Sequence, residues 1–200
     1  MEFCVPSLDR LIRPGDLVFF RGRGWKSRLI TLGTGPFWHR GFSHVGFASY
    51  VSGYRHICLV DATTLDDVPC VITGKTSGVR ARPLESQLAA YDGEVTVCPI
   101  NTAFPGIINY EARNYTDGQL GKEYDTVGAL HSRGSFVCGL LWKLGKLKES
   151  RDALFCSELA GNWLLVAGLM EHDNVSSLNP TSLAIEGEKQ GAFDTPWRCE

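Results

Sequence analysis

The sequence predicts one α+β domain with a central antiparallel sheet and a late helix. Strand-forming runs come early, at residues 17–20, 43–50 and 55–64, whereas the longest helical pattern spans residues 152–168. Strands first and a long helix late are typical of the α+β class. Because 200 residues of ordinary apolar content can bury one sizeable core, we assign residues 1–200 to a single domain.

The composition argues against several classes of partner. A formal net charge of -2 and a pI near 6.2 leave no basic footprint for nucleic acid. No apolar run approaches the roughly 20 residues that a membrane span needs. The N-terminus lacks a basic region followed by a hydrophobic one, so no signal peptide is expected. We therefore expect a soluble protein that is synthesised in a reducing cytoplasm, and the sequence leaves its oligomeric state and final site of action open.

The cysteines fit neither a disulfide framework nor a metal site. There are seven, an odd number without regular spacing, and none forms a Cys-x-x-Cys pair. His39 and His44 lie near each other in sequence but have no thiol beside them. We expect no metal and no cofactor.

The first two strands are predicted from short apolar patterns. The turn signature Arg13–Asp16 leads directly into the apolar run Leu17–Phe20. In the run 43–50, the residues His44, Gly46 and Ala48 share one face, and valine and phenylalanine occupy the other. The small residues leave space beside the histidine for another group, although a lone histidine at a strand start is more often structural.

The third strand carries a carboxylate that needs a partner. The run 55–64 follows a Ser-Gly turn, so we expect it to pair antiparallel to the second strand. Asp61 interrupts its apolar residues, and a buried carboxylate is too costly to leave unpaired. His44 on the neighbouring strand is the obvious partner.

The remaining elements are predicted in less detail. A glycine- and arginine-bearing loop follows Cys70–Thr73, and the tail is expected to form a turn at Asn179–Leu183 followed by a short surface segment. Residues 85–91 and 105–120 fit helices, and residues 94–100 fit a strand. The segment 21–42 is expected to be a loop, and the segment 128–149 is expected to be irregular or partly helical. The first carries Trp25, Phe37 and Trp38, which suit either a substrate groove or a cover for the sheet edge.

The late helix places a cysteine where a thiol is activated. Apolar residues recur at helical spacing from Cys156 onward: Leu159, Ala160, Trp163, Leu164 and Ala167. At a helix N-terminus, unpaired backbone N–H groups and the dipole favour a thiolate, the nucleophilic form. The alternative is an inert cysteine on a core-facing stripe.

Together these residues form a Cys-His-carboxylate set. His44 would take the proton of Cys156, and Asp61 would orient the imidazole and favour its charged form. The backbone N–H of Cys156 would help to hold an oxyanion.

Six sequence blocks resemble the circularly permuted papain-like proteins of the NlpC/P60 superfamily, and in particular the YiiX-like group. They stand in the family's order: Pro14-Gly15-Asp16, Ser43-His44-Val45-Gly46, Leu59-Val60-Asp61-Ala62, Gly121-x-x-Tyr124-Asp125, Phe155-Cys156-Ser157-Glu158-Leu159 and Asn179-Pro180. No single block is specific, but six in order span nearly the whole domain.

The resemblance implies a permuted papain-like fold in which the cysteine-bearing helix packs against the central sheet. It assigns Cys156 as the nucleophile, His44 as the base and Asp61 as the third residue, with His56 and Asp66 as alternatives for the third place. It also matches Tyr124 to a tyrosine near the nucleophile, whose hydroxyl we expect to contribute to the oxyanion site. The alternative for this tyrosine is a core aromatic residue.

Three functions follow from this sequence as hypotheses. The leading one is a thiol hydrolase that cleaves an amide bond in a peptidoglycan stem peptide or a similar conjugate, through an acyl-enzyme. The second is a lipid-directed acyl hydrolase or acyltransferase on the same fold, since fold does not fix function. The third is a non-catalytic binding or assembly module, which a missing triad member would favour; none is missing.

Overall fold

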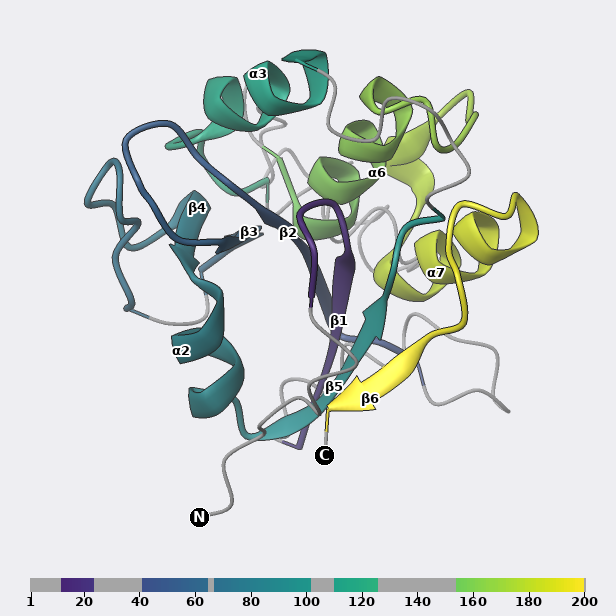
Figure 1. Cartoon of the computed structure of the whole chain (residues 1–200), viewed down its shortest axis with the longest axis horizontal. Coiled ribbons are helices and arrows are strands. Elements are labelled where there is room, and N and C mark those ends of the chain that lie inside the picture. Colours follow the sequence, from purple (N-terminus) through teal and green to yellow (C-terminus); the bar gives the residue numbers. More distant parts are fainter. Residues whose placement is uncertain (1–11, 24–40, 65–66, 102–109, 126–153, 200) are drawn as a thin grey trace, which may run out of the picture.

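The architecture is a single antiparallel sheet with helices on both faces (Figure 1). The computed structural model describes residues 12–23, 41–64, 67–101, 110–125 and 154–199. Within them the sheet order is β4-β3-β2-β1-β5-β6, and every neighbouring pair is antiparallel. The strands are β1 (Leu17–Gly22), β2 (His44–Ser49), β3 (Cys58–Thr63), β4 (Gly78–Pro83), β5 (Gly93–Cys98) and β6 (Trp197–Cys199). The helices are α2 (Leu84–Ala90), α3 (Tyr110–Gln119), α6 (Cys156–Val166) and α7 (Pro180–Lys189), with a 3-10 turn at Val175–Ser177. The α+β class and the antiparallel sheet are confirmed.

Alternation along the strands gives the sheet two different buried faces. Val45 and Phe47 of β2 belong to the large apolar cluster beneath α6, whereas Ala48 joins a smaller cluster with Phe20 and Leu59. Helix α2 lies over the smaller cluster, through Leu84. In Figure 1, α2 and α6 accordingly lie on opposite sides of the sheet.

Helix α6 buries the stripe that its sequence predicts. Cys156 is 6% exposed, and Leu159, Ala160 and Leu164 are fully buried. The Trp163 ring stacks on Phe47 of β2 at 5.1 Å between centroids. This packing fixes the helix on the middle of the sheet and so determines where its first residue lies.

The Pro-Gly-Asp turn anchors the start of β1. Gly15 has φ of 100°, and a Cβ atom there would lie 2.4 Å from Ile100, so only glycine fits. The buried Asp16 carboxylate accepts backbone N–H bonds from Arg13 at 2.8 Å and Ile100 at 3.1 Å. The turn that starts β1 therefore explains why the chain has a glycine and an aspartate in the block Pro14-Gly15-Asp16.

Three expectations were wrong. The glycine- and arginine-bearing loop contains a full strand, β4, because its arginines are buried at 0% and 4% exposure instead of lying in solvent. The tail is not a short surface segment: Asn179 caps α7 by accepting the Ser182 N–H at 2.9 Å, with Pro180 at the first helical position. The third strand also begins later than expected, at Cys58.

Several predicted segments fall outside the described residues. These include most of the segment 21–42 with its three aromatic residues, the segment 128–149 and residues 105–109 of the helix expected at 105–120. Among the helices that the structure describes, none combines the length and apolar character needed to cross a membrane.

Candidate active site

Cys156 is the first residue of α6, as the sequence predicts. The preceding residue, Phe155, has an extended backbone, and its side chain does not cap the helix. No capping side chain therefore pairs with the first backbone N–H groups of α6, which lie at the same end of the helix as the thiol. The next residue, Ser157, is fully buried and donates its hydroxyl to the Leu178 carbonyl at 2.7 Å. The helix start is thus tied to the chain just before α7.

His44 and Asp61 meet across two adjacent strands. The distance from His44 Nε2 to Asp61 Oδ2 is 2.8 Å, and the side chains are 15% and 0% exposed. Gly46 lies directly opposite Asp61, and a Cβ atom there would lie 3.0 Å from the Asp61 Cβ. A Cβ atom at this position would also lie 2.8 Å from Leu59 Cδ1 and from the Val60 carbonyl oxygen, so a larger residue would disturb the strand that carries Asp61.

The Cys156 side chain lies close enough to the imidazole for its charge and a side-chain interaction to act on the pKa of His44. Because Asp61 bonds Nε2, Nδ1 is the ring nitrogen that remains for the sulfur. Burial alone would lower the pKa of His44, but the charge of Cys156 and the bonds to Asp61 and Cys156 outweigh it and raise the pKa from 6.5 to about 10. The surroundings therefore favour the imidazolium form.

Asp61 has a second partner that sequence reasoning missed. Arg82 of β4 donates its Nη2 to the same oxygen, Asp61 Oδ2, at 2.5 Å. Burial raises the pKa of Asp61, but the His44 contact and then the charges of Arg82 and Arg80 lower it below its usual value. The signal available in the sequence was the Arg-x-Arg alternation of residues 80–82, which places both guanidinium groups on the face that carries the carboxylate.

Aromatic side chains border the imidazole on the α2 side. The Phe20 ring lies 5.7 Å from the His44 ring and 4.8 Å from the Tyr91 ring. Burial raises the pKa of Tyr91, whose hydroxyl hydrogen-bonds to Ser43. These residues form an apolar wall beside the base.

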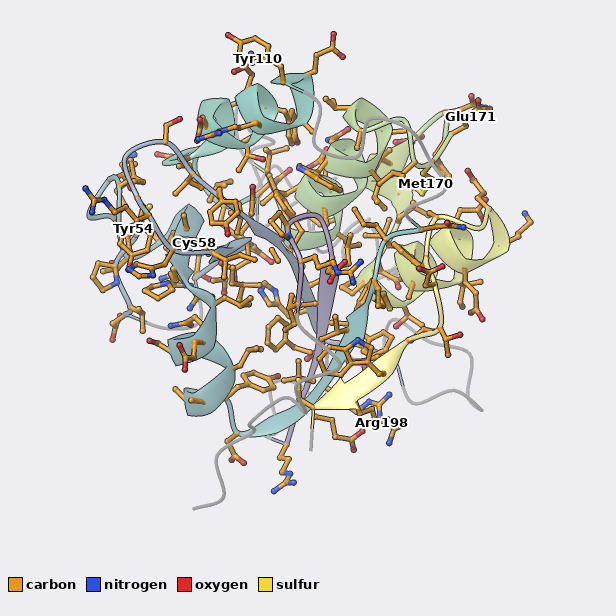
Figure 2. All side chains as sticks on the ribbon, in the orientation of Figure 1. Tyr54, Cys58, Tyr110, Met170, Glu171 and Arg198 are labelled. Atoms are coloured by element: carbon orange, nitrogen blue, oxygen red, sulfur yellow. The ribbon has the colours of Figure 1, made fainter. Side chains whose placement is uncertain are left out.

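The structure places the other predicted residues less closely. Tyr124 is half-buried, and its backbone bridges to Leu154, two residues before Cys156; the role of its hydroxyl stays a prediction. His56 is exposed and packs edge-on against Tyr54, which is labelled in Figure 2, so it does not take the third place. Asp66 lies outside the described residues.

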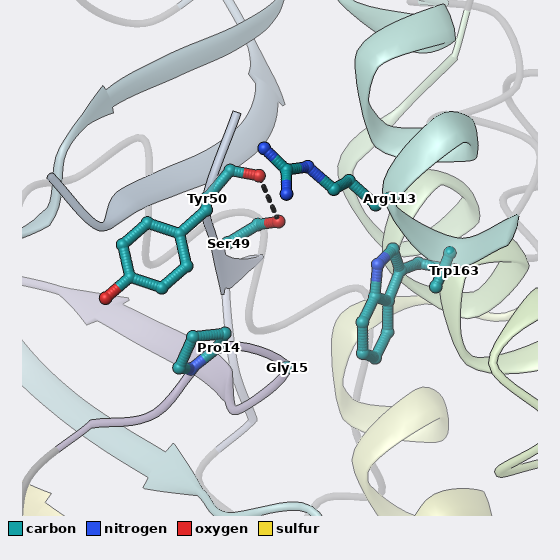
Figure 3. Close-up of a pocket in the computed structure, with 7 residues that line it drawn as sticks. Pro14, Gly15, Ser49, Tyr50, Arg113 and Trp163 are labelled. Atoms are coloured by element: carbon teal, nitrogen blue, oxygen red, sulfur yellow. Dashed lines mark hydrogen bonds between the residues drawn. The ribbon is translucent and has the colours of Figure 1, made fainter. Parts of the chain in front are cut away.

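A small cavity lies at the opposite end of β2. Its lining includes Ser49, the last residue of β2, and Tyr50 directly after it, together with Trp163 of α6 and the exposed Arg113 of α3 (Figure 3). Its volume of about 40 Å³ suits a few water molecules. Five residues of strand separate Ser49 from His44, roughly 17 Å. The cavity is therefore remote from the thiol and the imidazole.

Metal ligands do not gather elsewhere in the part of the chain that the structure describes. There, no group of three or more His, Cys, Asp or Glu residues is arranged to hold an ion. The described cysteines Cys58, Cys70, Cys98, Cys156 and Cys199 are all free thiols.

Comparisons with known proteins show a likeness in fold alone. No protein-family model matches the chain, and no curated protein matches it. Among solved structures, the chain is similar to the crystal structure of metalloprotein yiiX from Escherichia coli O157:H7, DUF1105. The two are 19% identical, with a TM-score of 0.52, over 92% of this chain and 87% of that one. The YiiX-like part of the expected resemblance is therefore supported.

Proposed function

We propose that this protein is a cysteine-dependent hydrolase that cleaves an amide bond through an acyl-enzyme on Cys156. The observation that carries the proposal is the position of His44, which contacts both Cys156 and the buried Asp61 carboxylate. A nucleophile beside a base, with the base hydrogen-bonded to a group that orients it, is the arrangement that thiol acyl transfer requires.

The first half-reaction transfers an acyl group to the sulfur. The Cys156 thiolate attacks the carbonyl carbon, a C–S bond forms, and the carbonyl electrons move to oxygen. Backbone N–H groups at the start of α6, together with the Tyr124 hydroxyl, hold this oxyanion. When the oxyanion collapses, the C–N bond breaks and the leaving amine takes the proton of the His44 imidazolium.

The second half-reaction restores the thiol. His44, now neutral, removes a proton from water, and the hydroxide oxygen attacks the thioester carbon. The C–S bond breaks, the carboxylic acid leaves, and the proton on His44 returns the pair to its thiolate–imidazolium form. Asp61 holds the ring orientation through both steps.

The fold and the chain order support a permuted papain-like domain. The histidine strand β2 and the carboxylate strand β3 precede the cysteine helix α6, which packs against the sheet. We infer from this order and from the YiiX-like fold that residues 1–200 form one permuted NlpC/P60-type domain. The substrate class that fits is a peptidoglycan stem peptide or a similar amide-linked conjugate.

The similar protein yiiX is a metalloprotein, so the fit of these residues to a metal ion bears on the mechanism. Asp61 Oδ2 already accepts bonds from His44 and Arg82. A cation bound there would face a guanidinium group and would have to displace it. The donor set therefore does not fit a metal, and no step of the proposed mechanism uses one.

The experiment that tests the proposal measures alkylation of Cys156 by iodoacetamide from pH 4 to 9. Mass spectrometry resolves the seven cysteines, and the variants are His44→Ala and, as a matched control, His56→Ala, whose histidine is exposed. We expect fast modification that persists below pH 7 in the wild type and in His56→Ala, and that is lost in His44→Ala. Slow modification that His44→Ala leaves unchanged would reject the hydrolase and favour the non-catalytic binding module.

A second measurement separates amide from ester chemistry. Activated peptide and acyl-lipid substrates are offered to the wild type and to Cys156→Ser, and trapped thioesters are identified by mass. A peptide-derived thioester on Cys156 is expected; a lipid-derived thioester alone would favour the lipid-directed acyl hydrolase or acyltransferase.

A further inference from the structure

We infer that Arg82 is a positioning residue of this site: its guanidinium fixes the Asp61 carboxylate toward His44 and offsets its charge, so that the imidazole can release its proton as well as hold it. This inference rests on the proposed function. It adds to the three-residue set a fourth residue that acts through Asp61.

Three adjacent strands align the groups. Strand β4 carries Arg82, β3 carries Asp61 and β2 carries His44, in the sheet order β4-β3-β2. One atom, Asp61 Oδ2, receives both the His44 Nε2 contact at 2.8 Å and the Arg82 Nη2 bond at 2.5 Å. The carboxylate cannot rotate without weakening both contacts.

Burial strengthens the interaction between Arg82 and the Asp61 carboxylate. Asp61 and Arg82 are 0% and 4% exposed, so water screens their interaction poorly. A buried carboxylate without this counter-charge would bind the imidazolium proton more tightly. A base that never releases its proton cannot protonate the leaving amine, so the arginine keeps the imidazole within its working range.

The groups around the imidazole limit what else can produce this effect. From β1 the neighbour is Phe20, which also contacts Tyr91 after α2, and from α6 the neighbour is Cys156. Among the described residues Arg80 is also buried, and it shares the face of β4 with Arg82.

Arg80 differs in what its side chain contacts. Its Nη1 donates to the carbonyl oxygens of Val68 and Thr76, each at 2.7 Å, and so fixes the segment before β4. Arg82 instead contacts the carboxylate that orients the base. Arg80 is therefore the matched control for Arg82: it is also a buried arginine on β4, but its Nη1 bonds hold backbone carbonyls and not the carboxylate.

The test compares Arg82→Gln, Arg82→Lys and Arg80→Gln with the wild type. The pH at which the His44 ring titrates is followed by ¹⁵N NMR of the imidazole, and the Cys156 alkylation rate is measured across the same pH range. In Arg82→Gln we expect His44 to titrate about one pKa unit higher, a tenfold change in proton affinity, whereas alkylation of Cys156 at pH 5 should stay as fast as in the wild type because the imidazolium is retained. Arg82→Lys is expected to restore the His44 titration, and Arg80→Gln to shift it less than Arg82→Gln does.

A pair of variants keeps the inference testable if Arg82→Gln does not fold. Asp61→Asn leaves the guanidinium beside the imidazole without its carboxylate, whereas Asp61→Asn with Arg82→Gln removes both charges, a change that buried ion pairs often tolerate. His44 is expected to titrate at a lower pH in the single variant than in the double variant. Equal titration in the two would overturn the inference.

The outcomes separate this inference from the proposed function. Slow, unactivated alkylation in the wild type would reject the hydrolase while the NMR titration still reports on Arg82. Activated alkylation in the wild type, with a His44 titration that Arg82→Gln leaves unchanged, would reject the role of Arg82 alone.

Discussion

The two faces of the central sheet bury their residues in opposite ways. The face beneath α6 is filled by apolar side chains such as Val45, Phe47 and Leu164. The other face combines a small apolar cluster with the buried charges of Asp61, Arg80 and Arg82. His44, the first residue of β2, pairs with Asp61 on this face. The first face stabilises by removing apolar area from water, and the second by pairing charges that would each be costly alone.

This difference teaches where the chemistry can reside. Apolar packing is insensitive to protonation, so the α6 face can hold the nucleophile in place at any pH. A paired charge network responds to protonation, and it is this face that supplies the base. Mutations on the apolar face should therefore change stability without changing the pH profile of Cys156, whereas mutation of His44 on the charged face should change both.

The largest effect is expected from breaking the charge network. Asp61→Ala leaves the Arg82 guanidinium buried without its carboxylate, and we expect the free energy of unfolding to fall by about 3–5 kcal/mol, the usual range for such a broken pair. Urea denaturation at pH 7 measures it. A loss below about 1 kcal/mol would show that the charged face contributes little to stability.

A matched truncation on the apolar face should be costly without touching the chemistry. Leu164 is fully buried in α6, eight residues after Cys156, and Leu164→Ala is expected to lower the free energy of unfolding by about 3 kcal/mol. The pH profile of Cys156 alkylation should match that of the wild type. A displaced profile would mean that the two faces are coupled through the helix.

The pH dependence of stability should follow the charged face. Because the folded-state pKa of His44 is raised from 6.5 to about 10, its contribution is full below pH 6.5 and is lost by about pH 10. The lowered pKa of Asp61 adds stability that is present above its usual value of 3.8 and is lost as the pH falls below it.

The measurement compares wild type, Leu164→Ala and His44→Gln by urea denaturation at a series of pH values. Toward pH 10 the wild type is expected to lose at least about 1.4 kcal/mol more than His44→Gln, the equivalent of one pKa unit. Leu164→Ala should lose as much as the wild type. Equal alkaline slopes in wild type and His44→Gln would contradict the raised pKa.

The same contrast explains what the sequence could predict. Strands β1 to β3 and helix α6 were predictable because their apolar residues alternate or recur at helical spacing, and the pairing of Asp61 with His44 followed from the cost of an unpaired carboxylate. Strand β4 was missed because its alternation is apolar and charged, which reads as a surface strand or a loop. Arg82 was missed with it, since only the sheet order shows that it lies beside Asp61.

Helix α7 was missed for a different reason. Its apolar pattern is weak, and its start is signalled mainly by Asn179 and Pro180, an N-cap followed by a proline at the first helical position. Both residues are equally common in turns, which is how the sequence was interpreted. The contact of Leu178 with the start of α6 shows why the chain needs an ordered segment there.

The smallest effect is expected at a buried polar contact that ties the nucleophile's helix to this segment. Ser157→Ala removes the hydroxyl that bonds the Leu178 carbonyl, and should cost about 1 kcal/mol of unfolding free energy. Ser176→Ala, an exposed serine that bonds Glu158, is the control and should change it by less than about 0.5 kcal/mol. If the helix start is held mainly by apolar packing, Ser157→Ala will leave the alkylation rate of Cys156 unchanged at pH 7. A rate that falls with the lost bond would instead show that one polar contact on the apolar face sets the position of the thiol relative to His44.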